Sequence, residues 1–282
     1  MTARLAVLGF PIAHSRSPRI HAAAYRELGL DWHYSAVRCG EEGLAPFLQG
    51  RGAEWRGFSV TMPLKVEAHR IAGELDAVAA ESGVVNTLLR RGDGGWFGAN
   101  TDVPGLSAAI ARARLDVRCT VVLGSGATAV SAILAARRLG AERITLLARN
   151  ADAGRTLVDR FTGTRAAPDA APMELVYGGD GTEPPSEPDA RTLVISALPG
   201  PAAARVPLPQ GLTGTPLFDV AYDPWPSPLA ARWREAGGEA HPGTEMLVEQ
   251  ALVQVRIFVH GDPTRPLDDD EAAVRSAMRR AV

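Results

Sequence analysis

The sequence predicts an α/β fold divided into two domains. Short apolar segments alternate with amphipathic segments along most of the chain, which indicates strands and helices in layers with mostly parallel strands. Near the middle, a glycine-rich turn joins an apolar strand to an apolar helix. The length of 282 residues allows two separate hydrophobic cores.

The composition favours a small-molecule ligand. The formal net charge of −2 gives no reason to expect a nucleic acid or an anionic membrane surface as a partner. Cys39 and Cys119 are far apart and indicate neither a disulfide framework nor a zinc site, so we expect no metal and a reducing cytoplasm. The first residues lack the pattern of a signal peptide, and no apolar run approaches the ~20 residues of a membrane helix.

The first part of the chain alternates strands and helices. Ser17-Pro18 is typical of a helix start, with serine as the N-cap and proline at the first helical position. We expect strands over residues 5–8, 33–37 and 58–61, and helices over residues 17–28, 42–48 and 63–75.

A β-hairpin is predicted next, because a glycine-rich turn signal separates two apolar segments, residues 84–89 and 96–100. A turn centred on Asp93 places Asn86 opposite Asn100, and Asn100 is expected to be structural. Asp102 follows the second strand and lies at the same end of the hairpin as Asn86. It is suited to cap the following helix, expected over residues 104–114.

The middle of the chain predicts one half of a dinucleotide-binding fold. A strand over residues 119–123 leads through a glycine-rich turn into a helix to residue 139, and a second strand follows over 143–148. The glycines of the turn allow its tight path and a close approach to a pyrophosphate, to which the helix N-terminus donates. A purely structural turn is the alternative. The expected cofactor-binding residues here are Gly124, Ser125, Gly126, Ala127 and Thr128.

The residue after the second strand predicts which cofactor is bound. NAD would call for an acidic residue there to bind the ribose hydroxyl, whereas this chain has Arg149. Because a guanidinium binds a 2′-phosphate through charge-assisted hydrogen bonds, we expect NADP, with Arg155 as a candidate second contact. A solvated Arg149 without a ligand is the competing interpretation.

The rest of the chain continues the alternation less regularly. Residues 163–191 are rich in glycine, proline and aspartate and predict loops around a strand over 174–177. Further strands are expected over residues 192–196 and 217–222. Further helices are expected after the proline-rich stretch at 223–228, over residues 244–259 and over residues 268–280.

Lysine occurs once in this chain, at Lys65, and the rest of its 30 cationic residues are arginines. Unlike a guanidinium, an amine can give and take a proton. Pro63 suits the first position of a helix, which places Lys65 in the opening turn, where unpaired backbone amides disfavour an ammonium. A role in proton transfer is therefore the hypothesis, and a solvated surface lysine is the alternative.

Several separated motifs together resemble the shikimate dehydrogenase family over essentially the whole chain. In chain order they are Gly9-Phe-Pro-Ile-Ala-His-Ser-Arg-Ser-Pro18 with His21, Ser59-Val-Thr-Met-Pro-Leu-Lys65, Val85-Asn-Thr87, Asn100-Thr-Asp102, Asp219-Val-Ala-Tyr222 and Gly243-Thr-Glu-Met-Leu-Val-Glu-Gln250. The sequence departs from the family pattern at Ala22 and Ser59, where asparagine is common, and at Thr244-Glu245, where Leu-Gly is common. Glu245 matters most, since that glycine normally lies close to the nicotinamide.

This resemblance implies an activity and its site. The activity is the reversible, NADP-dependent reduction of 3-dehydroshikimate to shikimate, a step of aromatic amino acid biosynthesis through chorismate. Whether Lys65 transfers the proton or only stabilises the charge of the alkoxide stays open. The implied catalytic residues are Lys65 and Asp102, and the implied substrate-binding residues are Ser15, Ser17, Thr61, Asn86, Tyr222 and Gln250.

The resemblance also implies a domain arrangement. Residues 1–101 with 238–282 would form an α/β substrate domain and residues 102–237 a Rossmann-type NADP-binding domain, with the reaction in the cleft between them. A monomer or a homodimer is expected.

Several alternatives are open at this point. The substrate could be quinate or an amino analogue of shikimate, or the protein could be a ligand-binding sensor without catalysis. Residue by residue, Ser17 and Asp102 could be helix caps only, Asn86 a turn residue and Gln250 a helix surface residue.

Overall fold

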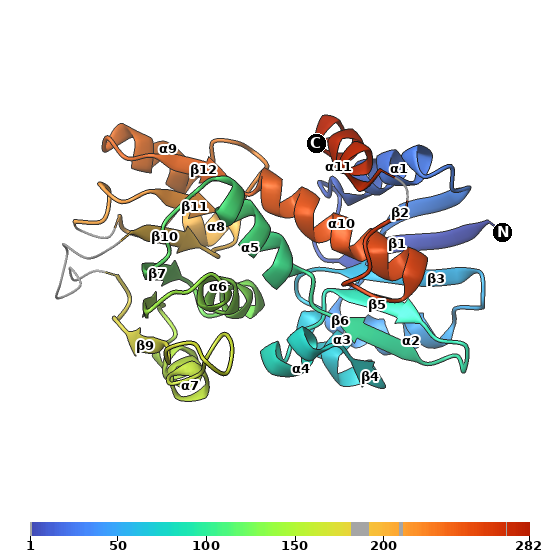
Figure 1. The fold of residues 1–282 in the computed structure, drawn as a ribbon, viewed down its shortest axis with the longest axis horizontal. Helices are drawn as coiled ribbons and strands as arrows, with labels where there is room; N and C mark the ends of the chain where they lie inside the picture. Colours follow the sequence, from blue (N-terminus) through green and yellow to red (C-terminus); the bar gives the residue numbers. More distant parts are fainter. Residues whose placement is uncertain (1, 182–191, 209–210, 269) are drawn as a thin grey trace. The chain divides into compact units, whose positions relative to one another are not determined.

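The computed structural model describes residues 2–181, 192–208, 211–268 and 270–282. The chain divides into two compact units, Met1–Gly105 with Leu247–Val282, and Leu106–Met246 (Figure 1). Each unit contains one six-stranded sheet, which confirms the predicted α/β class. The predicted division into a substrate domain and a cofactor domain at residues 101/102 and 237/238 stays a prediction. Among the described residues, no helix is both long and apolar enough to span a membrane.

The first unit is built on a sheet with the strand order β2-β1-β3-β5-β6-β4. β1 pairs in parallel with β2 and β3, whereas β5 pairs antiparallel with both β3 and β6. The ends of β1, β3 and β6 and the start of β5 therefore share one edge of the sheet. The strand bounds are β1 (Ala3–Gly9), β2 (Trp32–Arg38), β3 (Trp55–Val60), β4 (Glu74–Leu75), β5 (Thr87–Arg90) and β6 (Trp96–Ala99).

Helices pack on both faces of this sheet because residues 5–8 of β1 are all apolar and buried. Leu5 and Val7 belong to one buried cluster and Ala6 and Leu8 to another, since successive strand residues point to opposite faces. The first cluster includes residues of α1 (Ser17–Glu27), α10 (Thr244–His260) and α11 (Glu271–Arg280). The second includes residues of α2 (Leu44–Gln49, after the 3-10 turn η1, Glu41–Gly43), α3 (Lys65–Ile71) and α4 (Ala77–Ser82).

The pairing of β5 with β6 confirms the predicted hairpin and its register. Thr87 lies opposite Ala99, so Asn86 and Asn100 lie opposite each other one position further. The Asn86 N–H donates to the Ala99 carbonyl at 3.0 Å. This register brings Asn86 beside the segment that follows β6, where α5 (Asp102–Arg112) begins.

Several helix boundaries predicted for this unit were wrong. The helix expected over residues 63–75 begins at Lys65 and ends at Ile71, and Glu74–Leu75 instead pair with β6. Ser17 is the first residue of α1 rather than its N-cap, which is Arg16. The helix expected from residue 104 begins at Asp102 itself, so Asp102 is not the residue before the helix.

Helix α4, which is six residues long, was missed although both of its ends carry local signals. Its start signal is Asp76, whose carboxylate accepts a hydrogen bond from the Ala79 N–H at 2.6 Å. Its end signal is Gly83, which has a φ of 67°, in the left-handed region that glycine adopts at helix ends.

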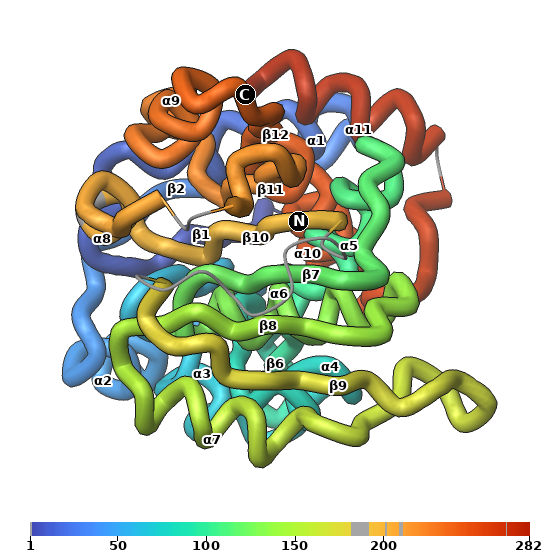
Figure 2. The backbone as a smooth tube through the Cα atoms, turned by 90° about the vertical axis from the view of Figure 1, so that its left-hand side faces the viewer, coloured from blue at the N-terminus to red at the C-terminus, as the bar shows by residue number. Residues whose placement is uncertain are grey.

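The second unit has the strand order of a dinucleotide-binding fold. Its strands are all parallel and follow the order β12-β11-β10-β7-β8-β9 (Figure 2). If β7 is numbered strand 1 and the sheet is read from the β9 edge to the β12 edge, the order is 3-2-1-4-5-6. This is the doubly wound order, which confirms the Rossmann-type prediction. The bounds are β7 (Cys119–Leu123), β8 (Arg143–Leu147), β9 (Glu174–Tyr177), β10 (Leu193–Ser196), β11 (Leu217–Asp219) and β12 (Ala240–Pro242).

The helices of this unit are α6 (Ala127–Arg138), α7 (Ala151–Phe161), α8 (Gly200–Ala203) and α9 (Pro228–Glu235), with most of α5. Helix α7 was missed, although Asn150 caps it by accepting from the Ala153 N–H at 3.1 Å. The elements α8 and β12 were also missed, because such short segments carry little periodicity. The strand expected over residues 217–222 ends at Asp219. Residues 182–191 of the predicted loop region lie outside the described residues.

Candidate functional site

The first unit holds an ion pair at the shared edge of its sheet. The Lys65 Nζ donates to Asp102 Oδ2 at 2.5 Å, and the two side chains are 12% and 8% exposed. Lys65 follows the end of β3 as the first residue of α3, and Asp102 follows the end of β6 as the first residue of α5. Lys65 is therefore paired and mostly buried, unlike a solvated surface lysine.

Asn86 completes this group from the start of β5. Its Nδ2 donates to Asp102 Oδ1 at 2.9 Å, while its Oδ1 accepts from the Thr101 N–H and from the Thr87 hydroxyl, each at 2.9 Å. The amide is thus oriented with its NH₂ group towards the carboxylate. Asn100 supports the same segment, because its Oδ1 accepts from the Asp102 N–H at 3.0 Å.

Ser15 and Thr61 lie in the loops that follow β1 and β3, at the same edge, and Ser17 is the first residue of α1. The Ser15 Oγ accepts from the Ser17 N–H at 3.3 Å, and Ser17 is buried at the start of α1. A Cβ at Gly9 would lie 2.3 Å from Thr61 Cγ2, so the absence of a side chain at Gly9 lets the two loops pack together. The sheet topology thereby gathers these hydroxyls at the edge that carries the Lys65–Asp102 pair.

Gln250 is brought to this region by close packing of α5 and α10. A Cβ at Gly105 would lie 2.6 Å from Gln250 Cβ, so only glycine fits there. Gln250 is buried, and its Nε2 donates to the Leu247 carbonyl at 2.7 Å, which is not the environment of a surface residue. Tyr222 belongs to the second unit, where it is half-buried in the segment after β11.

The structure shows the surroundings of three departures from the family pattern. Ser59 is buried in β3 and hydrogen-bonds to Tyr34 and Gln254. Glu245, in the first turn of α10, lies 3.6 Å from the guanidinium of Arg112. Ala22 lies on the exposed side of α1.

His21 holds the start of α1 and is neutral near pH 7. Its Nδ1 lies 3.0 Å from the Ser17 carbonyl, and its ring stacks on Tyr34 with 4.0 Å between centroids. Burial lowers the pKa of His21 to about 4, more than its hydrogen bond to the Ser17 carbonyl raises it. The donor to the Ser17 carbonyl is therefore a neutral imidazole Nδ1–H.

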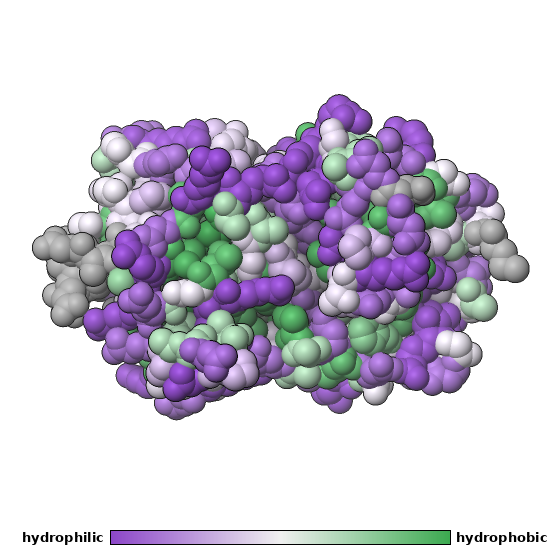
Figure 3. Space-filling model, viewed as in Figure 1, coloured by the Kyte–Doolittle hydropathy of each residue, from purple (hydrophilic) through white to green (hydrophobic). Residues whose placement is uncertain are grey.

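The second unit holds a cavity of about 450 Å³ beside the glycine-rich turn. Gly124 has a φ of 113°, in the left-handed region, and lines the cavity with Ser125. Gly126 is the N-cap of α6, and Ala127 and Thr128 form its first turn, so these three residues start the helix. Figure 3 shows a mostly hydrophilic visible face, with an apolar patch on the second unit.

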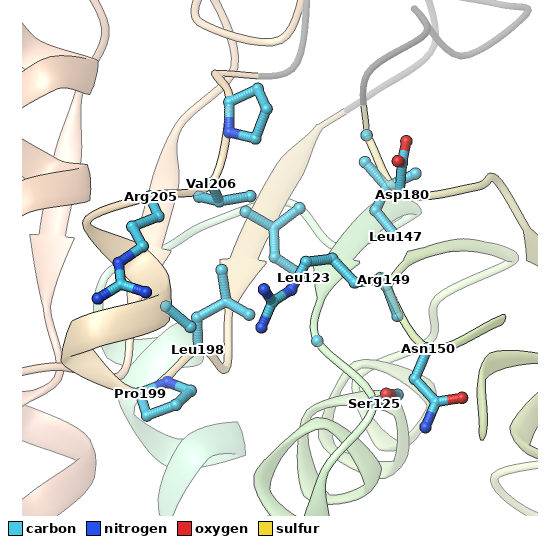
Figure 4. A pocket seen from close by; sticks show the side chains of 15 residues that line it. Leu123, Ser125, Leu147, Arg149, Asn150, Asp180, Leu198, Pro199, Arg205 and Val206 are labelled. Carbon is cyan, nitrogen blue, oxygen red and sulfur yellow. The ribbon is translucent and has the colours of Figure 1, made fainter.

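Two arginines face this cavity from different elements. Arg149 reaches from the end of β8 towards Leu123 and Leu198, and Arg205 lies on the α8 side (Figure 4). Within the part of the chain that the structure describes, neither guanidinium forms an ion pair or a hydrogen bond. Arg155 does not line the cavity; it lies 3.5 Å from the carboxylate of Asp152.

Sequence reasoning missed Arg205 and Asn150 as cavity residues. Asn150 could have been found from its position, since an asparagine after a strand and before a helical pattern is an N-cap signal. Arg205 gave no signal, because the turn that carries it follows a helix of only four residues. Asp180 also lines the cavity.

Known proteins resemble this chain over its whole length. Residues 7–88 match the family described as "Shikimate dehydrogenase substrate binding domain". A Synechocystis sp. protein named "Shikimate dehydrogenase (NADP(+))" is 30% identical over 92% of this chain and 90% of its own. The crystal structure of Mycobacterium tuberculosis shikimate dehydrogenase is 38% identical, with a TM-score of 0.80 over 99% of each chain. Shikimate 5-dehydrogenase of Thermus thermophilus, solved with NADP(H) and shikimate, is 28% identical, with a TM-score of 0.78 over 99% of this chain and 100% of its own.

Proposed function

This chain belongs to the shikimate dehydrogenase family, and we propose that it catalyses the reversible, NADP-dependent reduction of 3-dehydroshikimate to shikimate. The observation that carries the proposal is the buried pair of Lys65 and Asp102 beside Asn86. A sensor without catalysis would not need an amine held against a carboxylate at the edge where hydroxyl donors gather.

We propose that the second unit binds the cofactor. The glycine-rich turn and the start of α6 supply backbone donors for phosphate, and Arg149 with Arg205 supplies positive charge without a counter-ion among the described residues. The apolar lining suits the adenine ring. When bound, NADPH supplies the hydride that reduces the C3 carbonyl of the substrate.

The residues of the first unit would bind the substrate and move the proton. Ser15, Ser17 and Thr61 offer hydroxyls to a small ring that carries a carboxylate and several hydroxyls. In the reductive direction the carbonyl oxygen gains a proton, and the Lys65 ammonium is the proposed donor. Asp102 would hold the ammonium in place and accept a hydrogen bond from a substrate hydroxyl.

Asn86, Gln250 and Tyr222 complete the proposed substrate contacts. Asn86 has its NH₂ group committed to Asp102, so it would act on the substrate as part of that pair. A cytoplasmic location, expected from the two distant cysteines, and a monomeric or homodimeric state, implied by the family resemblance, are further parts of the proposal.

The direct test is turnover of several ring acids by the purified protein. Shikimate, quinate and an amino analogue of shikimate would each be offered with NADP and with NAD. The proposal expects the highest kcat/KM for shikimate with NADP. A higher value for quinate or the amino analogue would assign a different substrate within the family, and no turnover of any of them would favour the sensor.

A further inference from the structure

A chain of buried side-chain hydrogen bonds begins at Tyr34, on the β2 side of the first sheet. The Tyr34 hydroxyl donates to Ser59 Oγ at 2.6 Å, and the Ser59 hydroxyl donates to Gln254 Oε1 at 2.7 Å. The Gln254 Nε2 donates to Thr87 Oγ1 at 3.1 Å and lies 3.3 Å from the Asn86 carbonyl oxygen. All of these side chains are buried, so water does not compete for these bonds.

The same chain continues to the Lys65–Asp102 pair. The Thr87 hydroxyl donates to Asn86 Oδ1 at 2.9 Å, and Asn86 Nδ2 donates to Asp102 Oδ1 at 2.9 Å. The other carboxylate oxygen of Asp102 accepts from Lys65. Residues of β2, β3, α10 and β5 are thus linked through side chains to the group proposed to act on the substrate.

Every bond between Tyr34 and Asp102 has the same direction. Hydroxyls and carboxamides can both donate and accept, so one fixed bond decides how the next group must turn. Because Tyr34 donates to Ser59, the Ser59 proton is directed to Gln254, which leaves the Gln254 NH₂ group for Thr87. Burial raises the pKa of Tyr34, so its hydroxyl keeps the proton that starts the chain.

This row of hydrogen bonds matters most at Asn86, whose side-chain amide could rotate by 180°. The rotated amide would place Oδ1 against the Asp102 carboxylate, and two acceptors would face each other. The Thr87 hydroxyl opposes this rotation because it can donate only to Oδ1 once Gln254 donates to Thr87. The Thr101 N–H contributes to the same preference, so loss of the Thr87 hydroxyl would weaken the orientation without abolishing it.

We infer that Thr87, Gln254 and Ser59 are positioning residues that orient Asn86 and, through it, the Asp102 carboxylate towards the substrate. This inference rests on the proposed function, because it assigns a purpose to the orientation of Asn86 and Asp102. Ser59 stands where asparagine is common in the family, and its hydroxyl both accepts from Tyr34 and donates to Gln254.

The test compares Thr87→Val, which removes the hydroxyl at nearly constant shape, with Thr87→Ser, which keeps it. Thr87→Val is expected to lower kcat for shikimate by about tenfold, the low end of the effect of losing a group that orients an active-site residue. Thr87→Ser should stay within threefold of the wild type. The KM for NADP should not change, since the proposed cofactor residues belong to the other unit.

Tyr25→Phe is the matched control for general damage to the buried core. Tyr25 is buried beside His21, like Tyr34, but its hydroxyl has no hydrogen-bond partner among the described residues. This variant should keep the wild-type kcat. Gln254→Met removes the donor to the Thr87 hydroxyl. It is the second variant if Thr87→Val does not fold.

A second readout does not depend on turnover. The protein contains only three asparagines and four glutamines. The side-chain amide signals of Asn86 can therefore be assigned in an NMR spectrum by comparison with Asn86→Asp. Thr87→Val and Gln254→Met should shift these signals, and Tyr25→Phe should not. If the wild type does not oxidise shikimate, the proposed function fails while this readout still tests the positioning.

The inference is overturned if folded Thr87→Val or Gln254→Met leaves both kcat and the Asn86 signals unchanged. It is also overturned if Tyr25→Phe or Thr87→Ser lowers kcat as much as Thr87→Val does.

Discussion

Replacement of Lys65 by alanine is expected to lower kcat by about 10² to 10⁴. The chain contains no second lysine, so no other lysine amine can take over the proton transfer. The loss corresponds to about 3 to 5 kcal/mol of transition-state stabilisation at about 1.4 kcal/mol per tenfold. The variant also removes the closest partner of the Asp102 carboxylate, at 2.5 Å, which we expect to cost about 1 to 3 kcal/mol of folding stability.

The assay is the oxidation of NADPH with saturating 3-dehydroshikimate, with urea unfolding as a check that each variant is folded. Lys65→Arg separates the two roles that the sequence leaves open. A guanidinium keeps the positive charge beside Asp102 but does not release a proton at neutral pH. If Lys65 transfers the proton, Lys65→Arg should be about as slow as Lys65→Ala, and if it only stabilises charge, arginine should restore at least tenfold.

A role of Lys65 in the chemical step is refuted if folded Lys65→Ala turns over within tenfold of the wild type. A rise in the KM for 3-dehydroshikimate with unchanged kcat would also refute it, because that pattern reports substrate binding without a role in the chemical step.

Three further predictions concern other parts of the chain. Arg149→Ala should raise the KM for NADP by about 10- to 100-fold, because charge-assisted hydrogen bonds are lost, and should leave the KM for NAD within threefold. Arg155→Ala is the control. Equal effects of Arg149→Ala on both KM values would contradict the assignment. Burial lowers the pKa of His21 from its ordinary 6.5 to about 4 in the folded protein. Between these pH values the unfolded chain binds a proton at His21 that the folded protein does not. The free energy of unfolding should therefore fall by about 3 kcal/mol as the pH drops from 6.5 to below 4. Urea unfolding of His21→Gln should show a flatter pH dependence, and an equal slope in both proteins would exclude this origin. Gly9→Ala should destabilise folding by about 1 to 3 kcal/mol, because its Cβ would lie 2.3 Å from Thr61 Cγ2, while Gly73→Ala, with open space around it, should change stability by less than about 0.5 kcal/mol.

The positions of most strands and the glycine-rich turn were predictable because their signals are local. A continuous apolar run such as residues 5–8 of β1 indicates a buried strand whatever lies around it. The order of strand, glycines and helix at residues 119–139 specifies the start of a dinucleotide fold. The hairpin register followed from its turn, which placed Asn86 opposite Asn100 correctly. Periodicity did not reveal the short elements α4, α8 and β12, which contain three to six residues.

The sequence by itself determined the α/β class, the strand-to-helix glycine turn, the motifs of the family and the place of Lys65 in the first turn of a helix. Only the tertiary structure decided that Lys65 is mostly buried against Asp102, that Arg205 joins Arg149 at one cavity, and that Gln254 links Tyr34 and Ser59 to Asn86. The physical reason is that propensity and periodicity act over a few neighbouring residues. Hydrogen bonds and ion pairs between distant residues depend on which strand ends the sheet topology brings to the same edge.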